Sequence, residues 1–378
     1  MNAVPETGSH SQRGDIRVAF LLAGLHRVSR GAEVAFESIA HELGDIPGFA
    51  VTLIGSGKER PGRRYRFIHS PCIPREKFER WPRFPPFRSE YAWEEATFAA
   101  QLGKRYEPNA YDITVTCSYP FLNWLLRLRK QSARRPQHIF VTQNGDWPVQ
   151  ARNSEYRWFG CDALICTNSV YFDLHKKRGR TWLIPNAVDP ARFQEALPDR
   201  QGLGLLQSSV VILMVSALVA SKRVLEGIRA VAPMDDIHLL VAGDGPLRDQ
   251  VESEGRKLLG SRFSRITLPF ERMPAVYRSA NVLLHMSRDE PFGNVYVEAL
   301  AAGLPVVTHD WASTRWLFEN EAVLVDTNDS AAVRTGLRQA LGRSSPGDVA
   351  NRLSLVNRRF TWRAVADAYA ECLQATLQ

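Results

Sequence analysis

Apolar positions along this chain occur in two patterns, short continuous runs and helical spacing. An apolar run at residues 16–24 (IRVAFLLAG) has the length of a buried strand, and residues 32–43 (AEVAFESIAHEL) carry apolar side chains at helical spacing. A strand, a loop and a helix in this order are typical of the opening of a parallel sheet. Further strands of the first half are predicted at residues 50–55, 112–118, 138–143 and 162–167.

The second half repeats strand and helix with short loops. Strands are predicted at residues 210–218, 238–245, 265–269, 281–287, 305–310 and 322–326. Helices are predicted at residues 224–232, 247–259, 275–280, 294–303, 313–319 and 330–341. Such a repeat predicts a second parallel sheet with helices on both faces.

Three further segments divide the chain. Residues 184–193 (IPNAVDPARF) have the composition of a linker, and residues 362–377 predict a final amphipathic helix. Residues 73–93, rich in Pro, Arg and aromatic side chains, predict an irregular insertion, suited either to an interface or to packing over a domain edge. We therefore predict an α/β protein with a tail (1–14), an N-terminal domain (15–185), a C-terminal domain (186–358) and a closing helix (359–378) that packs back on the first domain.

Charge is uneven along the 378 residues. The net charge is +8, and residues 1–185 hold 27 Lys and Arg against 18 Asp and Glu. Two interpretations stay open: solvated surface charge, or a face that meets an anionic membrane or a phosphate-bearing acceptor. Nucleic acid is disfavoured, because no binding motif accompanies the charge.

Targeting and redox features are weak. No apolar run approaches the roughly 18–20 residues that span a bilayer, and the first residues lack a signal-peptide pattern, so we expect a cytoplasmic protein, with peripheral contact at the inner membrane face as an extension. The five cysteines are odd in number and have no CxxC spacing, so neither disulfides nor a metal site is predicted.

The segment HMSRDEPFGNVYVEALAAGLPVV carries the most chemistry. A strand ends before Glu290, and a helix begins near Asn294 with Glu298 in its first turns. The free N–H groups at this helix start suit a diphosphate, and Gly293 permits a close approach of the backbone. Glu298 can accept hydrogen bonds from the vicinal hydroxyls of a ribose, and Glu290 from those of a hexose. Taken alone, the two carboxylates could equally lie on the surface.

This segment resembles the E-x7-E motif of the GT-B retaining glycosyltransferases of family 4, running from Glu290 to Glu298. Four further segments are similar to other parts of that family: MVSAL…SKR…GIRAV, LLVAGDGPLRDQVE, LIPNAVDPARF and FTWRAVADAY. The resemblance implies two Rossmann-like domains facing each other across a cleft. It also implies metal-independent transfer from a nucleotide-sugar, with UDP- or GDP-sugar favoured and no other cofactor. The acceptor would be a saccharide or lipid-linked saccharide in surface polysaccharide, lipopolysaccharide or glycolipid synthesis.

The resemblance also implies residue roles. Lys222 matches the lysine that contacts the donor diphosphate, and Arg223 beside it adds a second positive charge. Glu298 matches the ribose-binding residue, and Glu290 faces the donor sugar and is a catalytic candidate together with Lys222. The remaining donor-side matches are Phe292, Gly293, Asn294, Gly243 and Gly245. On the acceptor side the matches are Gly24 and Gly31.

Some positions depart from the family pattern. Ala217 stands where the family usually has a phosphate-binding Arg, and Ala187 stands where it has Gly. The usual N-domain His is replaced by the loop TQNGDWP, where Asn144 or Asp146 takes its place. Asp146 could orient or deprotonate an acceptor hydroxyl, or the loop could be an ordinary Asn-Gly-Asp turn.

Three rival functions remain at this stage. The first is another GT-B activity, such as a nucleotide-sugar epimerase or a sugar phosphorylase. The second is a non-catalytic subunit that binds a partner enzyme, supported by Ala217 and the altered loop. The third is a membrane-surface scaffold, which would explain the basic N-terminal half but not Lys222, Glu290 and Glu298.

Overall fold

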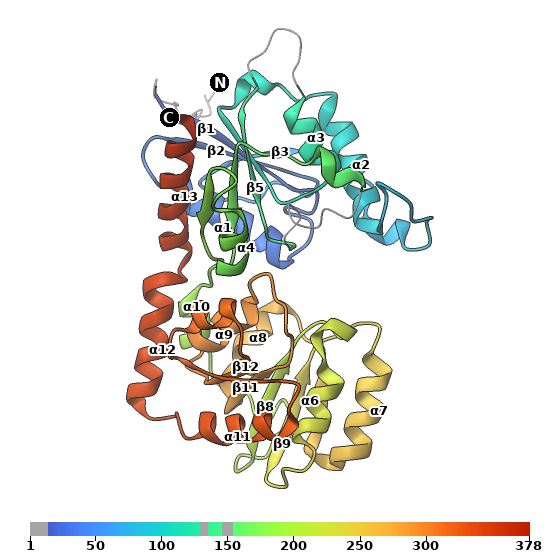
Figure 1. Ribbon diagram of the computed structural model, residues 1–378, viewed down its shortest axis with the longest axis vertical. Helices are drawn as coiled ribbons and strands as arrows, with labels where there is room; N and C mark the ends of the chain where they lie inside the picture. Colours follow the sequence, from blue (N-terminus) through green and yellow to red (C-terminus); the bar gives the residue numbers. More distant parts are fainter. Residues whose placement is uncertain (1–13, 129–134, 146–153) are drawn as a thin grey trace, which may run out of the picture. The chain divides into compact units, whose positions relative to one another are not determined.

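The computed structural model describes residues 14–128, 135–145 and 154–378. They form two units (Figure 1). Unit 1 contains the N-terminal part through Cys166, together with His175–Ile184 and Ala366–Gln378. Unit 2 contains Thr167–Leu174 and Pro185–Val365.

Unit 1 is built on a seven-stranded parallel sheet in the order β3-β2-β1-β4-β5-β6-β7. The strands are β1 (Ile16–Leu21), β2 (Phe49–Gly55), β3 (Arg66–His69), β4 (Ile113–Thr116), β5 (Gln137–Val141), β6 (Ala163–Cys166) and β7 (Thr181–Leu183). The helices that accompany them are α1 (Gly31–Leu43), α2 (Glu90–Gly103) and α3 (Phe121–Arg127). Helix α4 (Ser169–His175) follows β6 in the chain and, except for His175, belongs to unit 2.

Unit 2 has a six-stranded parallel sheet in the order β10-β9-β8-β11-β12-β13. The strands are β8 (Val210–Val215), β9 (Ile237–Ala242), β10 (Phe263–Ile266), β11 (Val282–His285), β12 (Val306–His309) and β13 (Ala322–Val325). The helices are α5 (Pro190–Gln194), α6 (Val224–Val231), α7 (Arg248–Leu259), α8 (Met273–Ser279), α9 (Asn294–Ala301), α10 (Ala312–Phe318), α11 (Ser330–Leu341) and α12 (Pro346–Arg359), and α13 (Trp362–Leu377) follows. The prediction of two parallel-sheet α/β domains is confirmed.

Alternate residues of each strand in unit 2 enter different cores. In β8, Val211 and Leu213 pack with side chains of α8, α9 and α12, whereas Ile212 and Met214 pack with α6, α7 and α11. Successive side chains of a strand point to opposite faces of its sheet. Both faces are therefore buried, which explains why these strands are continuous apolar runs in the sequence.

Several elements differ from the sequence-based expectation. The predicted linker contains the short helix α5, whose Asp189 caps the amide of Ala191 and whose Phe193 is buried. The predicted irregular insertion ends early, because α2 begins at Glu90 with Ser89 as its N-cap. The strands β3 and β7 and the helices α2, α3, α4 and α12 were not predicted. No helix among the described residues is long and apolar enough to cross a bilayer.

Candidate active site

The strands β8 and β11 are neighbours at the point where the strand order of unit 2 reverses. Ile212 pairs with Val282 and Leu213 with Leu283, so both strands end at the same edge of the sheet. In open α/β sheets ligands bind beyond this edge, at such a reversal. The 3₁₀ turn Ala220–Lys222 follows β8, and the loop carrying Glu290 follows β11.

Three side chains meet at this edge. Lys222 Nζ donates to Glu290 Oε1, and His285 Nε2 lies 2.7 Å from the same oxygen. His285 and Glu290 are both buried, and Lys222 is partly exposed. The ring of His285 stands edge-on to Tyr296, at 5.0 Å between centroids, which limits its orientation. The structure thus brings together the predicted pair Lys222 and Glu290 and adds His285, for which no site role was predicted.

The environment of Glu290 keeps its carboxyl ionised. Burial would raise its pKa, but the hydrogen bond and charge of His285 and the charge of Lys222 outweigh that effect and lower the pKa to about 2. A carboxylate is an acceptor for hydrogen bonds. Glu290 is therefore suited to bind hydroxyl groups, and Lys222 is suited to stabilise an anion.

Helix α9 begins directly beside this pair. Its N-cap is Gly293, whose φ of 83° is left-handed, and a Cβ there would lie 2.5 Å from the ring of Tyr296. Only glycine adopts this conformation at low cost. Phe292 is buried, and Asn294 Oδ1 accepts from Asn186 Nδ2 at 3.2 Å. The turn is thereby held so that α9 starts at Asn294, as the sequence predicts.

Glu298 lies further along α9 and has a different partner. Tyr277 of α8 donates its hydroxyl to Glu298 Oε2 at 2.6 Å. Burial raises the pKa of Glu298, and the Tyr277 hydrogen bond and the charge of Arg192 counteract this in part. No contact of Glu298 with Lys222 or Glu290 is found in the described part of unit 2. Its predicted ribose role stays a prediction.

Arg223 has partners other than Lys222 and Glu290. Its guanidinium donates to Thr327 Oγ1 at 3.0 Å and to the carbonyl oxygens of Thr327 and Met286. Its backbone is left-handed, with φ of 55°. The contacts tie the loop after β8 to the loops after β11 and β13. The expected donor contact of Arg223 stays a prediction.

Gly243 and Gly245 allow two loops to approach. A Cβ on Gly243 would lie 1.9 Å from the carbonyl oxygen of Ser216, and one on Gly245 would lie 2.7 Å from that of Leu218. Leu218 N donates to Asp244 O at 2.8 Å. The glycines therefore support the loop that leads to Lys222.

The loop carrying Glu290 has a second support within unit 2. Thr167 Oγ1 and Asn168 Nδ2 both donate to the carbonyl oxygen of Pro291, at 3.1 and 2.5 Å. Both side chains follow β6 in the chain and are buried. They were not predicted as site residues, because a Thr-Asn pair after a strand is also typical of an ordinary turn.

The predicted acceptor-side residues lie in unit 1. Gly24 follows β1, and a Cβ there would lie 2.0 Å from Glu33 Oε1. Gly31 is the first residue of α1. Asn144 is exposed, and its Nδ2 lies 3.8 Å from Cys117 Sγ, whereas Asp146 lies outside the described residues.

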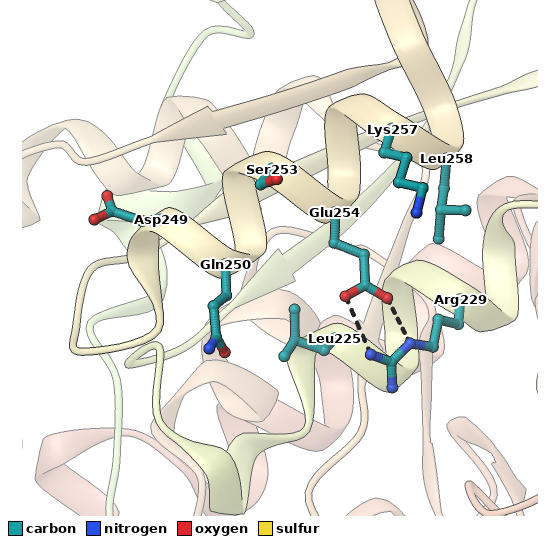
Figure 2. Close-up of a pocket in the computed structure, with 8 residues that line it drawn as sticks. All are labelled: Leu225, Arg229, Asp249, Gln250, Ser253, Glu254, Lys257 and Leu258. Carbon is teal, nitrogen blue, oxygen red and sulfur yellow. Dashed lines mark hydrogen bonds and ion pairs between the residues drawn. The ribbon is translucent and has the colours of Figure 1, made fainter.

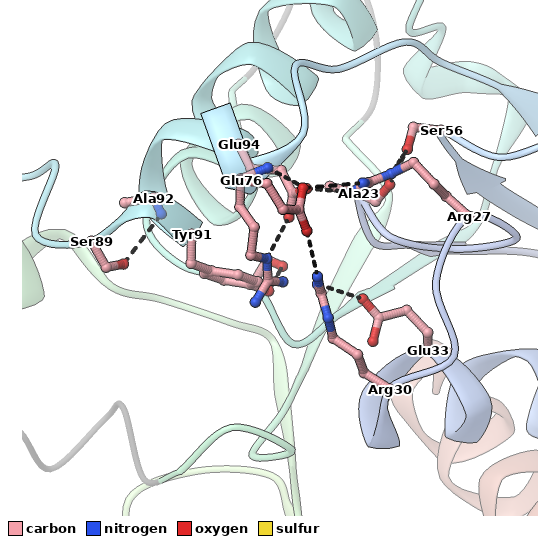
Figure 3. Close-up of polar contacts among 12 residues, drawn as sticks. Ala23, Arg27, Arg30, Glu33, Ser56, Glu76, Ser89, Tyr91, Ala92 and Glu94 are labelled. Atoms are coloured by element: carbon pink, nitrogen blue, oxygen red, sulfur yellow. Dashed lines mark hydrogen bonds and ion pairs between the residues drawn. The ribbon is translucent and has the colours of Figure 1, made fainter. Parts of the chain in front are cut away.

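Charged side chains gather near Gly24 and Gly31 (Figure 3). Glu94 of α2 accepts from the guanidinium groups of Arg27 and Arg75, and Arg30 contacts Glu76 at 3.4 Å and Glu33 at 3.8 Å. Burial raises the pKa of Glu33. The network fixes the loop between β1 and α1, which carries Gly24 and leads to Gly31.

No group of three or more His, Cys, Asp or Glu side chains able to hold a metal ion occurs among residues 14–128, 135–145 and 154–378.

Residues 198–354 match the family model of the glycosyl transferases group 1. This stretch, which lies within unit 2, is therefore similar to that family. The match includes Lys222, His285, Glu290, α9 and Glu298, which are the residues and the helix that form or adjoin the site.

Two curated relatives extend this comparison. The lipopolysaccharide core biosynthesis glycosyltransferase LpsD of Rhizobium meliloti is 27% identical over 256 residues, which are 66% of this chain and 73% of that protein. The alpha-monoglucosyldiacylglycerol synthase of Streptococcus pneumoniae is 28% identical, over 39% of this chain and 37% of that protein. The chain spans about a third of the length of two of the curated relatives it matches.

A solved structure resembles the whole fold. The sucrose-phosphate synthase of Thermosynechococcus elongatus superposes with a TM-score of 0.74 at 21% identity, over 95% of this chain and 98% of that one. The fold of the chain is therefore that of the GT-B glycosyltransferases.

Proposed function

We propose that this protein is a retaining glycosyltransferase that moves a sugar from a nucleotide-sugar, most suitably a UDP- or GDP-sugar, to an acceptor hydroxyl. The observation that carries the proposal is the contact of Lys222 with Glu290 at the strand-order reversal of unit 2, beside the start of α9. A sugar diphosphate is bound by three kinds of group: a cation and the amides of a helix start for the phosphates, and a carboxylate that accepts hydrogen bonds from the sugar hydroxyls.

The proposed reaction exchanges one bond at the anomeric carbon. The bond from this carbon to the diphosphate oxygen breaks, and the diphosphate leaves with the electron pair. The acceptor oxygen forms the new bond on the same face, and its proton passes to the departing phosphate. Lys222 and the amides of α9 stabilise the charge that develops on the diphosphate, while Glu290 holds hydroxyls of the donor sugar. Because a side-chain cation performs this task, we propose transfer without a metal ion.

The acceptor is proposed from the names of the relatives. One acts in lipopolysaccharide core synthesis and another is a glucosyldiacylglycerol synthase. We propose a saccharide or lipid-linked saccharide of a surface polysaccharide, lipopolysaccharide or glycolipid as the acceptor, and action at the cytoplasmic side of a membrane. Asn144 or Asp146 would lie on the acceptor side.

A panel of UDP-, GDP-, ADP- and TDP-sugars tests the proposal. The purified chain should release free nucleoside diphosphate from one of them, at a rate that a chelator leaves unchanged. Lys222→Ala should lower kcat by about 10²–10³-fold, because the leaving diphosphate loses its cation. Lys257→Ala, at an exposed position of α7, is the control. Failure of every donor, or equal rates for Lys222→Ala and the wild type, would contradict the proposal.

A binding measurement tests Glu298. Glu298→Gln should raise the Kd of the matching nucleoside diphosphate by about tenfold, because a neutral amide accepts hydroxyl hydrogen bonds more weakly than a carboxylate. Isothermal titration calorimetry measures this change. Tyr277→Phe removes only the hydroxyl that holds Glu298, and a smaller effect is expected. An unchanged Kd in Glu298→Gln would exclude contact with the nucleotide.

A further inference from the structure

An aromatic and basic segment extends from unit 1. Residues 78–88, called the aromatic tip, lie between the 3₁₀ turn Arg75–Phe78 and α2. In Figure 1 this segment, drawn in light blue, projects beyond the end of α2, away from the strands of unit 1. Trp81 and Phe84 remain 48% and 46% exposed, although both are large apolar side chains. Burial of such side chains is the usual outcome, so their exposure at one place is informative.

The tip is held in shape by Trp93 of α2. The ring of Phe87 stacks on Trp93 at 3.8 Å, and Trp81 packs against it edge-on at 4.9 Å. Trp93 Nε1 donates to the carbonyl oxygen of Pro82 at 3.3 Å. Because the rings support one another, Trp81 and Phe84 are presented without needing a partner to order them.

Ring contacts continue from the tip to a second exposed tryptophan. Phe87 packs against Phe121 at 4.8 Å, Phe121 against Trp124 at 5.6 Å, and Trp124 against Trp158 at 5.7 Å. Trp158 is 66% exposed. The aromatic surface therefore reaches from the tip to α3 and beyond it.

Basic side chains outnumber acidic ones on and beside the tip. Residues 75–88 contain five basic and two acidic side chains. Lys77 and Arg80 are exposed and form no ion pair with the described residues, and Arg83 remains exposed beside Glu90. Exposed cations next to tryptophan suit a layer that is anionic at its surface and apolar beneath it.

We propose that the aromatic tip docks this protein on an anionic lipid surface. Trp81 and Phe84 would enter the interfacial layer, where tryptophan is favoured, while Lys77, Arg80 and Arg83 meet the anionic headgroups. A projecting group of side chains needs no matching shape in a lipid layer, whereas a protein partner would have to supply a complementary pocket. The proposal does not depend on the sugar-transfer reaction, since it concerns residues of a different unit.

Vesicle co-sedimentation of the full chain tests the proposal. The wild type should bind vesicles of phosphatidylcholine mixed with phosphatidylglycerol, bind pure phosphatidylcholine far less, and lose binding as salt is added. Lys77→Glu combined with Arg80→Glu should lower the partition coefficient at least about tenfold, because each cation contributes about fivefold near an anionic surface. This variant alters no ring contact.

A second pair of variants separates the aromatic contribution. Arg80→Glu combined with Trp81→Ser should bind anionic vesicles still more weakly than Lys77→Glu combined with Arg80→Glu does. Its matched control is Lys257→Glu combined with Leu258→Ser, an adjacent basic and apolar pair on α7 that lines a surface hollow of unit 2 (Figure 2). The control should bind like the wild type. Transfer to a water-soluble acceptor should be equal in all variants, which separates this test from that of the proposed function.

Three results would overturn the proposal. The first is tip variants that bind anionic vesicles as the wild type does. The second is an equal loss in the α7 control, which would reduce the effect to net charge. The third is no vesicle binding by the wild type, which would leave the tip to a protein partner.

Discussion

At the scale of single residues, the position of Glu290 depends on a histidine. His285 ends β11 and approaches the same carboxylate oxygen that Lys222 contacts. The second oxygen, Oε2, forms no hydrogen bond with the residues that the structure describes. The carboxylate is therefore oriented through Oε1, and Oε2 is available to accept a hydrogen bond from a ligand hydroxyl.

We predict that His285→Ala lowers kcat/KM for the donor by roughly tenfold, because Glu290 loses the hydrogen bond that fixes its orientation. His285→Asn should retain more activity, since its amide can still donate. Steady-state kinetics with the donor found in the panel would measure both. Equal kinetics for His285→Ala and the wild type would show that Lys222 alone positions Glu290.

A buried carboxyl in unit 1 should make stability depend on pH. Glu95 of α2 accepts from Leu122 N at 2.8 Å at the start of α3, and burial raises its pKa to about 8. The folded state then binds a proton that the unfolded state has released, so stability should fall as pH rises from about 4.5 to about 8. The fall amounts to at most ~5 kcal/mol.

Glu95→Gln should remove this dependence and raise the Tm of unit 1 at the alkaline end of that range. Differential scanning calorimetry across the range would measure it. Glu90→Gln, at the start of the same helix, is the control and should keep the wild-type dependence. The same slope in Glu95→Gln and the wild type would contradict the assignment.

The sequence predicts part of the site and misses the rest for a physical reason. Lys222 and Glu290 follow apolar runs, so both are expected at strand ends, and the structure places them in contact. His285 lies inside such a run, where a histidine is usually a satisfied core residue. Contacts such as those of Thr167 and Asn168 with Pro291 join residues more than a hundred positions apart. The spacing of residues within a short stretch of sequence cannot predict such contacts.

At the scale of elements, the start of α9 depends on one glycine. Gly293 combines a left-handed backbone with a close approach to Tyr296, so a side chain would meet both conformational strain and a clash. Gly260, after α7, also has a positive φ, of 58°, but has open space around its Cβ position. Substitution at Gly260 therefore measures backbone strain alone, whereas substitution at Gly293 adds the clash with Tyr296.

Gly293→Ala should therefore destabilise unit 2 by more than Gly260→Ala. The second change should cost about 1–3 kcal/mol of unfolding free energy from backbone strain alone. The first should cost more and should also slow the reaction, because α9 would shift. Denaturant unfolding of both variants measures the difference, and similar costs would show that Tyr296 moves aside freely.

Secondary structure is predicted best where apolar residues are regular. Residues 330–341 and 362–377 were predicted as helices and form α11 and α13 with those bounds. β3 was missed because its four residues are partly or fully exposed, as in an edge strand. Helix α2 was missed because its buried face includes the carboxylates Glu94 and Glu95, which interrupt the apolar periodicity.

At the scale of the whole molecule, unit 1 is assembled from distant parts of the chain. It includes Ala366–Gln378, and Tyr369 of α13 lies with its ring 6.2 Å from that of Phe20 in β1. Phe360, nine positions earlier, belongs instead to a core of unit 2. Both side chains are buried. One short stretch of sequence therefore stabilises both units.

Tyr369→Ala should destabilise unit 1 and Phe360→Ala unit 2, each by about 3–5 kcal/mol, the usual cost of removing a buried ring. Hydrogen exchange measured by mass spectrometry would locate the effects. Exchange should rise in β1 and β4 for the first variant and in α9 and β12 for the second. Equal exchange in both units for either variant would contradict this division.

The contribution of Ala366–Gln378 to unit 1 also sets an order of events during synthesis. N-terminal domains commonly fold first, while the remainder of a chain is still being translated. Phe36 of α1 covers one part of Phe20 early, but the part that Tyr369 covers stays exposed until Tyr369 has left the ribosome, after nearly all of unit 2 has been made. At ordinary translation rates this wait is roughly 10 to 40 s, so the first half of the nascent chain is exposed to chaperones for that time.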